Sequence, residues 1–220
     1  MRFRHFVLAF LLTVLTISVY MLSTGRWRSP VVDVNAPFTI GLNALELAEY
    51  NYGDEVRKYA KEFDLPPEYL LALIVLECSG EASPGSRFEK GVYKKLIALR
   101  DGERKKFEQI RQEDLADASD ESIKNLATSW GPFQLMGYKC LGLDVEVSDI
   151  RGSDALYHGV RWINEEYGRM LRKKHFKDAF HYHNAGSRYP LIGKPRTHDP
   201  NYVSNGLRYM EYFKKEAAQQ

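Results

Sequence analysis

The chain has few cysteines: Cys78 and Cys140 are the only two among its 220 residues. So low a number excludes a small scaffold that depends on several disulfides. The two side chains either form one disulfide in an oxidising compartment or remain two buried thiols. Cys78 has no nearby His or Asn with motif support, so a cysteine nucleophile is also excluded.

The sequence also lacks the usual patterns of metal sites and phosphate sites. Four histidines of the C-terminal third lie loosely together: His175, His181, His183 and His198. They form no His-x-x-x-His helix pair and have no adjacent cysteine, which argues against a zinc site. Glycine-rich phosphate loops are absent too. We therefore expect no metal and no cofactor.

An excess of charge of either sign is also missing. All 29 acidic residues and every basic residue except Arg2 and Arg4 follow position 25, so this part carries almost no net charge. The basic run at 169–175 is typical of a solvated helix end. The composition therefore predicts no nucleic-acid partner.

Sustained strand-type alternation is absent, whereas helical periodicity recurs through the chain. The predicted helices are 42–63 with a break at Gly53, 67–78, 92–110, 119–127, 133–140, 154–173, 176–183 and 200–215. Loops rich in Gly, Pro, Ser and Asn separate several of them, at 79–86, 128–132 and 185–199. The prediction that follows is an all-α fold.

One long apolar run is present near the N-terminus. Residues 6–25 carry no formal charge and as a helix would span roughly 30 Å, enough to cross a bilayer. No Ala-x-Ala-like site follows, which favours an uncleaved signal anchor over a cleaved signal peptide. The predicted organisation is a transmembrane signal anchor at 1–25, a tether at 26–40 and one folded domain at 41–217.

Glu77 ends the apolar face of the predicted helix 67–78. One face of that helix carries, at i, i+3, i+4 and i+7 spacing, Leu70, Leu73, Ile74 and Glu77. Gly80 is a natural helix stop, so the carboxyl lies in the last turn, where the helix dipole is negative. Desolvation and the dipole both raise its pKa. The pattern indicates a general acid, with a solvent-facing helix-end Glu as the alternative.

Four short blocks resemble, in order, the signature blocks of lysozyme-like lytic transglycosylases. They are Glu77-Cys-Ser-Gly80, Ser129-Trp-Gly-Pro-Phe-Gln-Leu-Met136, His183-Asn-Ala-Gly186 and Asn201-Tyr-Val203. The resemblance covers most of 54–213. It implies a single lysozyme-like helical domain, α+β at most, and a peptidoglycan lytic transglycosylase with Glu77 as its catalytic acid.

The chain departs from the compact transglycosylase pattern between its first two blocks. Glu77 and Gln134 are 57 positions apart, and Cys78 separates Glu77 from Ser79. The long insert and the wording of 128–137 resemble the related N-acetylmuramidase domain of phage and bacterial lysins. Both families cut the same bond, so a hydrolytic N-acetylmuramidase is the alternative.

The implied reaction cleaves the β-1,4 bond between N-acetylmuramic acid and N-acetylglucosamine. Glu77 would protonate the bridging oxygen, and the muramic acid C6 hydroxyl would close onto C1 to leave a 1,6-anhydro end. A hydrolase that inverts configuration needs a second carboxylate about 6.5–9.5 Å from the first. Glu81 and Glu89 are the sequence candidates for that role.

The remaining blocks supply residues expected to bind substrate: Ser79, Gln134, Phe133, Met136, Asn184 and Tyr202. Their polar members would bond sugar amides and hydroxyls, and Tyr202 would place Glu77. The Phe and Met side chains would form an apolar wall that keeps the acid protonated. Trp130 either stacks on a sugar face or packs behind its loop.

The expected partners are peptidoglycan glycan strands and, through the N-terminal helix, the membrane. The predicted location is the bacterial inner membrane, single-pass, with the domain in the periplasm, or exported if the N-terminal segment is cleaved. Tethering suggests wall remodelling for a secretion or conjugation apparatus, and a tethered phage lysin fits equally well. A non-catalytic peptidoglycan-binding scaffold is the alternative of another class, although such a module gains nothing from a desolvated acid.

Overall fold

The computed structural model describes residues 41–219 of the chain. The signal anchor predicted at 1–25 and the tether predicted at 26–40 lie outside the described residues, so both stay predictions. Between residues 41 and 219, no helix has both the length and the apolar character needed to cross a bilayer.

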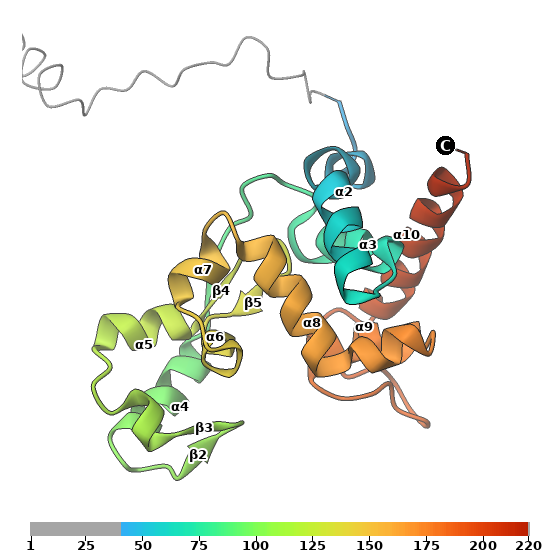
Figure 1. Cartoon of the computed structure of the whole chain (residues 1–220). Helices are drawn as coiled ribbons and strands as arrows, with labels where there is room; N and C mark the ends of the chain where they lie inside the picture. Colours follow the sequence, from blue (N-terminus) through green and yellow to red (C-terminus); the bar gives the residue numbers. More distant parts are fainter. Residues whose placement is uncertain (1–40, 220) are drawn as a thin grey trace, which may run out of the picture. The chain divides into compact units, whose positions relative to one another are not determined.

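α3 (Pro67–Cys78) is the most deeply buried helix of the described part. It packs against both α2 (Ala44–Phe63) and α10 (Tyr202–Ala217), as Figure 1 shows. Every residue of α3 from Tyr69 to Val75 is buried. A helix that is apolar all round needs cover on every side, and its neighbours provide it.

α8 (Ala155–Arg172) and α9 (Phe176–Ala185) complete the helical part. α8 contacts α2 and α9, and α9 contacts α10. Aromatic rings fill the junction, because the Tyr69 ring of α3 lies 4.4 Å from that of Phe180 and 6.3 Å from that of Tyr167, centre to centre. Residues 41–219 thus form one compact unit with its own core.

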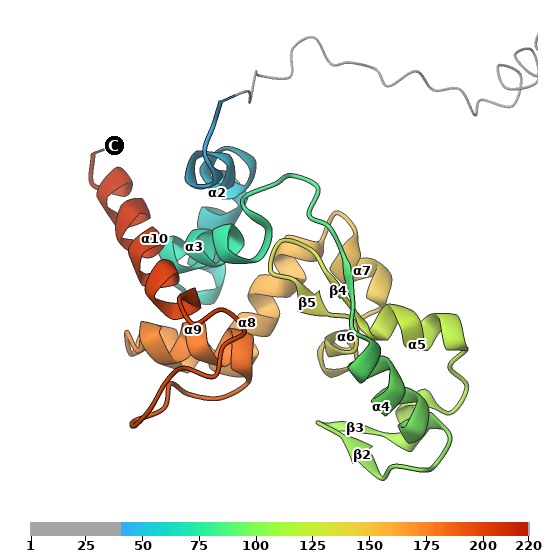
Figure 2. The ribbon, with the colours of Figure 1, turned by 180° about the vertical axis from the view of Figure 1, so that it is seen from behind.

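The segment between α3 and α8 is a mixed insert of short helices and strands. In chain order it contains β1 (Arg87–Phe88), α4 (Lys90–Arg100), β2 (Lys106–Phe107), β3 (Ile110–Arg111), the 3-10 helix η1 (Gln112–Leu115), α5 (Asp120–Leu126), β4 (Thr128–Trp130), β5 (Leu135–Met136), α6 (Lys139–Leu143) and α7 (Val147–Arg151). Three strands form an antiparallel sheet in the order β1-β4-β5, and β2 and β3 form a separate hairpin. Figure 2 shows that hairpin beside α4, at the far end of the domain from α10.

Two predicted helices of this insert are wrong. The helix predicted at 92–110 ends at Arg100, and β2 and β3 follow it. The helix predicted at 133–140 is replaced by β5 and the start of α6. Strands of two or three residues leave no alternation to detect, because that signal needs at least four residues. The fold is therefore α+β rather than all-α.

The break predicted at Gly53 is also wrong, since α2 runs through it. Asn43 caps the helix by accepting hydrogen bonds from two backbone N–H groups of its first turn. An ion pair of 2.5 Å between Glu49 and Arg57 spans the glycine. One glycine costs a helix only about 1 kcal/mol, which the cap and the burial against α3 outweigh.

Candidate active site

The end of α3 is held against α2, and this contact places Glu77. Ser79 ends the helix with φ of 55°, and its N–H bonds to the carbonyl of Val75. Gly80 follows with φ of +75°, and a Cβ on it would lie 2.4 Å from the backbone nitrogen of Ala48 in α2. Only glycine fits so close an approach at this backbone angle. The last turn of α3 is therefore fixed in space.

Two side chains of α2 hold the loop that follows. Asn51 donates its Nδ2 to the carbonyl of Gly80 at 2.7 Å, and the Tyr52 hydroxyl donates to the carbonyl of Glu81 at 2.5 Å. Both acceptors are backbone groups of the loop. Glu77 consequently sits between a rigid helix and an anchored loop.

The Glu77 carboxyl is largely removed from solvent, with its side chain 15 % exposed. Its Oε1 accepts a hydrogen bond from the hydroxyl of Tyr202, the first residue of α10. Burial raises the pKa of Glu77 to about 7, although the Tyr202 bond acts in the opposite direction. A carboxyl with this pKa remains partly protonated at neutral pH and can donate its proton.

His183, near the end of α9, lies beside the acid. Its Nε2 is 3.7 Å from Glu77 Oε1 and 3.1 Å from the backbone oxygen of Phe133, and its Nδ1 is 2.8 Å from the hydroxyl of Tyr167. Burial, with a smaller contribution from the positive charge of Lys139, lowers the pKa of His183 to about 4, although the hydrogen bond to the Phe133 carbonyl acts in the opposite direction. The ring is therefore neutral at pH 7. Sequence reasoning named His183 within a family-like block and among four histidines that it argued against as a zinc site, and assigned it no role.

A distortion in α8 accompanies this contact. Tyr167 has φ of −145° and ψ of 15° inside the helix. Its buried hydroxyl accepts a hydrogen bond of 3.4 Å from the hydroxyl of Tyr69 in α3. Local helix distortions of this kind are common at functional sites. The Tyr167 hydroxyl thus links α8 to Tyr69 of α3 and to His183 of α9.

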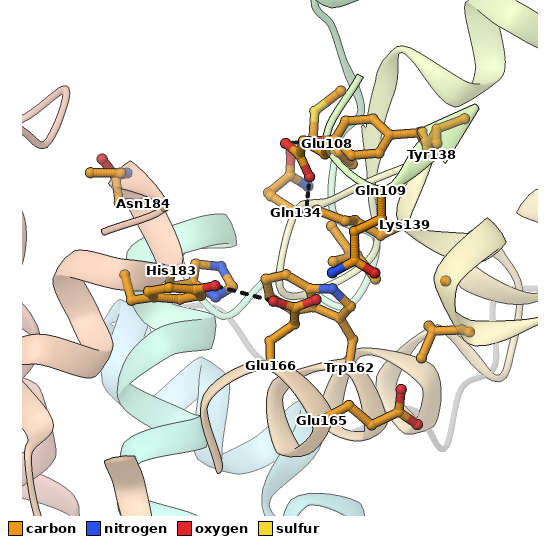
Figure 3. Close-up of a pocket in the computed structure, with 18 residues that line it drawn as sticks. Glu108, Gln109, Gln134, Tyr138, Lys139, Trp162, Glu165, Glu166, His183 and Asn184 are labelled. Carbon is orange, nitrogen blue, oxygen red and sulfur yellow. Dashed lines mark hydrogen bonds and ion pairs between the residues drawn. The ribbon is translucent and has the colours of Figure 1, made fainter. Parts of the chain in front are cut away.

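A cleft of about 670 Å³ opens on the other side of His183. Its walls come from the β2–β3 turn, β5, α6, α8 and the end of α9. Figure 3 shows Trp162 and Glu166 of α8 pointing into this space, with Asn184 set apart from them. Aromatic faces and carboxylates of this sort suit sugar rings and hydroxyls.

Carboxylates in the cleft are bonded to partners. Glu108, in the β2–β3 turn, accepts hydrogen bonds of 2.6 Å each from the Tyr138 hydroxyl and from Lys139 Nζ. Glu166 accepts a bond of 3.2 Å from the Tyr182 hydroxyl, drawn as a dashed line in Figure 3. These groups belong to the insert and to α8, and sequence reasoning missed them. Their signal was weak, because each is one of many charged residues in a polar stretch.

Gln134 lines the cleft, but its amide is already occupied within the chain. Its Oε1 accepts from the Ser129 hydroxyl at 2.8 Å, and its Nε2 donates to the carbonyls of Gly85 at 2.8 Å and Gly131 at 3.1 Å. The side chain thereby joins the loop after Glu77 to the turn between β4 and β5. This arrangement differs from the free sugar-binding amide expected from the sequence.

Phe133 and Met136 were expected to form an apolar wall. Phe133 is 1 % exposed, and its ring fits over Gly159 of α8, where a Cβ would come within 2.4 Å of it. Its backbone carbonyl lies within hydrogen-bond distance of His183 Nε2. Met136 is half-buried in β5 and lines the cleft.

Ser79 and Asn184 are both exposed. Ser79 is the capping residue that follows α3, and Asn184 lines the cleft. The Asn184 side chain accepts a hydrogen bond of 3.1 Å from the backbone N–H of His198, which ties it to the loop before α10.

The two candidates for a second carboxylate lie outside the cleft lining. Glu81 is exposed in the loop after α3. Glu89 precedes α4, and its carboxylate pairs with Arg87 Nε at 2.8 Å. The acidic residues that do line the cleft are Glu108, Glu165 and Glu166.

Three other sequence expectations concern side chains near the site. Trp130 donates its ring N–H to the carbonyl of Asn125 at 3.0 Å, and Arg151 lies over its ring, so it packs within the insert. Cys78 and Cys140 are both free thiols, and burial raises the pKa of each to about 11. Within 41–219 no cluster of His, Cys, Asp and Glu has the arrangement of a metal site.

Comparison with known proteins places the fold. No protein-family description and no curated protein matches the chain. Among solved structures, the Burkholderia AP3 phage endolysin matches with a TM-score of 0.50 and 18 % sequence identity, over 74 % of this chain and 71 % of that one. The domain has an α+β, lysozyme-like fold. At this identity the similarity concerns the fold alone.

Proposed function

We propose that the protein is a peptidoglycan lytic transglycosylase, which cleaves the β-1,4 bond between N-acetylmuramic acid and N-acetylglucosamine. The observation that carries the proposal is Glu77, a buried carboxyl with a pKa of about 7 that is held by Tyr202. His183, which lies beside it, lines a cleft of about 670 Å³. The endolysin-like fold supports a glycan-cleaving activity.

The proton is carried by the carboxyl oxygen that Tyr202 does not contact. Because Oε1 accepts the Tyr202 hydrogen bond, Oε2 is the oxygen available to hold the transferable proton. Glu77 gives this proton to the bridging oxygen, and the C1–O bond breaks as C1 develops oxocarbenium character. The leaving N-acetylglucosamine end departs as an alcohol.

Glu77 then acts as a base in the second step. Its carboxylate takes the proton of the C6 hydroxyl of N-acetylmuramic acid while that oxygen bonds to C1. The product is a 1,6-anhydro end, and Glu77 regains its proton. This route uses a single carboxylate and therefore needs neither Glu81 nor Glu89.

A hydrolytic N-acetylmuramidase is the second candidate. The similarity to an endolysin is compatible with either reaction. In the hydrolase, Glu166, which lines the cleft, would be the carboxylate that activates water. In that reaction Glu77 keeps its role as the acid, and only the nucleophile changes. The products separate the two candidates, since water leaves a reducing end.

The apolar run near the N-terminus suggests where the protein is located in the cell. Residues 6–25 would anchor the protein in the bacterial inner membrane, and 26–40 would let the domain reach the wall. An anchored enzyme of this kind would act locally on glycan strands, for example to make room for a secretion or conjugation apparatus.

Mass spectrometry of the soluble products released from purified peptidoglycan tests the proposal. Wild type should release fragments with 1,6-anhydro ends, and Glu77→Gln should release none. Glu81→Gln, on an exposed side chain of the adjoining loop, is the matched control and should remain active.

The remaining outcomes of this experiment discriminate between the candidates. Reducing ends from wild type, one water heavier and lost in Glu166→Gln, would establish the hydrolase. Binding of peptidoglycan without any released fragment would instead show a non-catalytic scaffold and contradict both enzymatic candidates.

A further inference from the structure

The proposed reaction assigns no task to His183, although its ring lies beside the acid. The side chain is 6 % exposed, and Nε2 is 3.7 Å from Glu77 Oε1. That separation is too long for a hydrogen bond. The ring is nevertheless close enough for any charge on it to change the acid, so its protonation state matters.

The hydrogen bonds around the ring define a neutral tautomer. The backbone oxygen of Phe133 can only accept, so Nε2 carries the hydrogen that points to it at 3.1 Å. On the other side, Tyr69 donates its hydroxyl to Tyr167, which leaves the Tyr167 hydroxyl free to donate to Nδ1 at 2.8 Å. Both ring nitrogens are thus satisfied without a positive charge.

Titratable or charged side chains surround His183 from each neighbouring element. Glu77 on α3, Lys139 on α6 and Tyr167 on α8 act on the ring directly. Tyr69, Tyr202 and Glu166 bond to Tyr167, Glu77 and Tyr182, respectively. Lys139 pairs with Glu108, and Glu166 is bonded to Tyr182. Glu77 is therefore the group beside His183 whose charge changes during the proposed reaction.

We propose that His183 is a positioning residue that holds a neutral N–H donor ready for the Glu77 carboxylate. This inference rests on the proposed function. While Glu77 is protonated, the N–H stays on the Phe133 carbonyl. Once Glu77 has given its proton to the leaving sugar, its carboxylate attracts the same N–H, because hydrogen bonds to a charged acceptor are about twice as strong.

His183 neither gains nor loses a proton in this sequence. The proton lost by Glu77 is on the leaving hydroxyl, and Glu77 recovers one from the nucleophile. The N–H lowers the energy of the charged state more than that of the neutral acid, which is what accelerates a reaction. A cationic ring at 3.7 Å would instead lower the pKa of Glu77 and remove its proton in advance.

The test compares two substitutions in the full chain, with the pKa of Glu77 measured by carbon NMR of its carboxyl. His183→Phe removes the donor, so the pKa of Glu77 should rise by about one unit and kcat should fall by about 10- to 100-fold, with KM little changed. His183→Gln keeps a neutral donor and should retain most of kcat and a near-normal pKa.

Three results would overturn the inference. The first is loss of kcat in His183→Phe with an unchanged Glu77 pKa, which indicates a purely structural role. The second is a fall of that pKa, which would mean that the His183 ring does not stabilise the Glu77 carboxylate.

The third uses wild type alone, in case a variant does not fold. Nitrogen NMR of His183 should show hydrogen on Nε2 and none on Nδ1 at neutral pH, and an imidazolium would contradict the inference. Failure of wild type to release glycan fragments would count against the proposed function, whereas the NMR titration is independent of turnover.

Discussion

Two regions of the site, here called the acid pocket and the cleft lip, give their carboxylates opposite surroundings. In the acid pocket, formed by Glu77, Tyr202 and His183, the carboxyl is buried beside a hydroxyl and a neutral ring. In the cleft lip, formed by the β2–β3 turn with Tyr138 and Lys139, Glu108 is more exposed and paired with a cation. The comparison teaches that the surroundings of a glutamate decide whether it can act as an acid or instead forms a structural ion pair.

The two regions also differ in how they are held in place. The acid pocket is built on α3, α9 and α10, which are long and packed against one another. The cleft lip belongs to a two-residue turn in which Glu108 has φ of 51°, an uncommon backbone angle for a residue other than glycine. We therefore expect changes in the acid pocket to have larger effects than changes in the lip.

The largest expected effect is on the pH dependence of stability. Folding raises the Glu77 pKa from 4.5 to about 7, so its contribution is complete below the lower value and is lost as pH rises through the higher one. Wild type should lose about 3 kcal/mol from this group between about pH 4 and pH 8, and Glu77→Gln should not. Urea unfolding of wild type and Glu77→Gln at both pH values measures these changes in stability. The contribution of His183 is present in both proteins and therefore cancels when they are compared. Parallel pH profiles would show that Glu77 is solvated.

Tyr202→Phe should have the next largest effect. The substitution removes the hydroxyl that holds Glu77, and kcat/KM should fall by about 10- to 100-fold. Because the Tyr202 bond lowers the pKa of Glu77, its loss should move the alkaline limb of the pH–rate profile upward. Tyr209→Phe on the same helix is the control and should leave both quantities unchanged. Equal effects of the two substitutions would refute the positioning role of Tyr202.

Gln134→Glu tests the link between the loop that follows Glu77 and the turn between β4 and β5. A carboxylate in place of the amide would face the carbonyls of Gly85 and Gly131 without a donor, which should cost about 2 kcal/mol of stability. Ser129→Ala removes a single bond to the same side chain and should cost less. Thermal unfolding of the two variants measures this order. A neutral outcome for Gln134→Glu would mean that the amide is free, as the sequence alone suggested.

The smallest expected effect is that of Glu108→Gln in the cleft lip. The glutamine retains an acceptor for Tyr138 and loses only the pairing with Lys139, which is partly exposed, so stability should change by less than about 1 kcal/mol. We expect KM to rise modestly while kcat stays unchanged. A fall in kcat as large as that of Tyr202→Phe would contradict the purely structural role of Glu108.

The sequence predicted the helical part of the fold far better than the insert. α3 was predicted with its observed bounds, because a run of apolar residues and the glycine that follows it are strong local signals. The insert failed because its strands are two or three residues long and exist only through pairing, as Ser129 does with Arg87 and Met136.

Tertiary structure also revised the site. Tyr202 reaches Glu77 from 125 positions away, and a motif resemblance was enough to suggest that pair. The neutral state of His183 could not be read from its block, because it depends on Tyr167 and on a backbone oxygen of Phe133. Likewise, nothing local indicates that three groups of the chain already occupy the Gln134 amide.

What the sequence determined by itself is a carboxyl at the end of an apolar helix, since spacing along one helix fixes which side chains share a face. Only the tertiary structure decided what surrounds that carboxyl: a tyrosine from α10, a neutral histidine from α9 and a cleft walled by the insert. The physical reason is that desolvation and hydrogen bonding depend on atoms near in space, and in this domain those atoms come from segments distant in the chain.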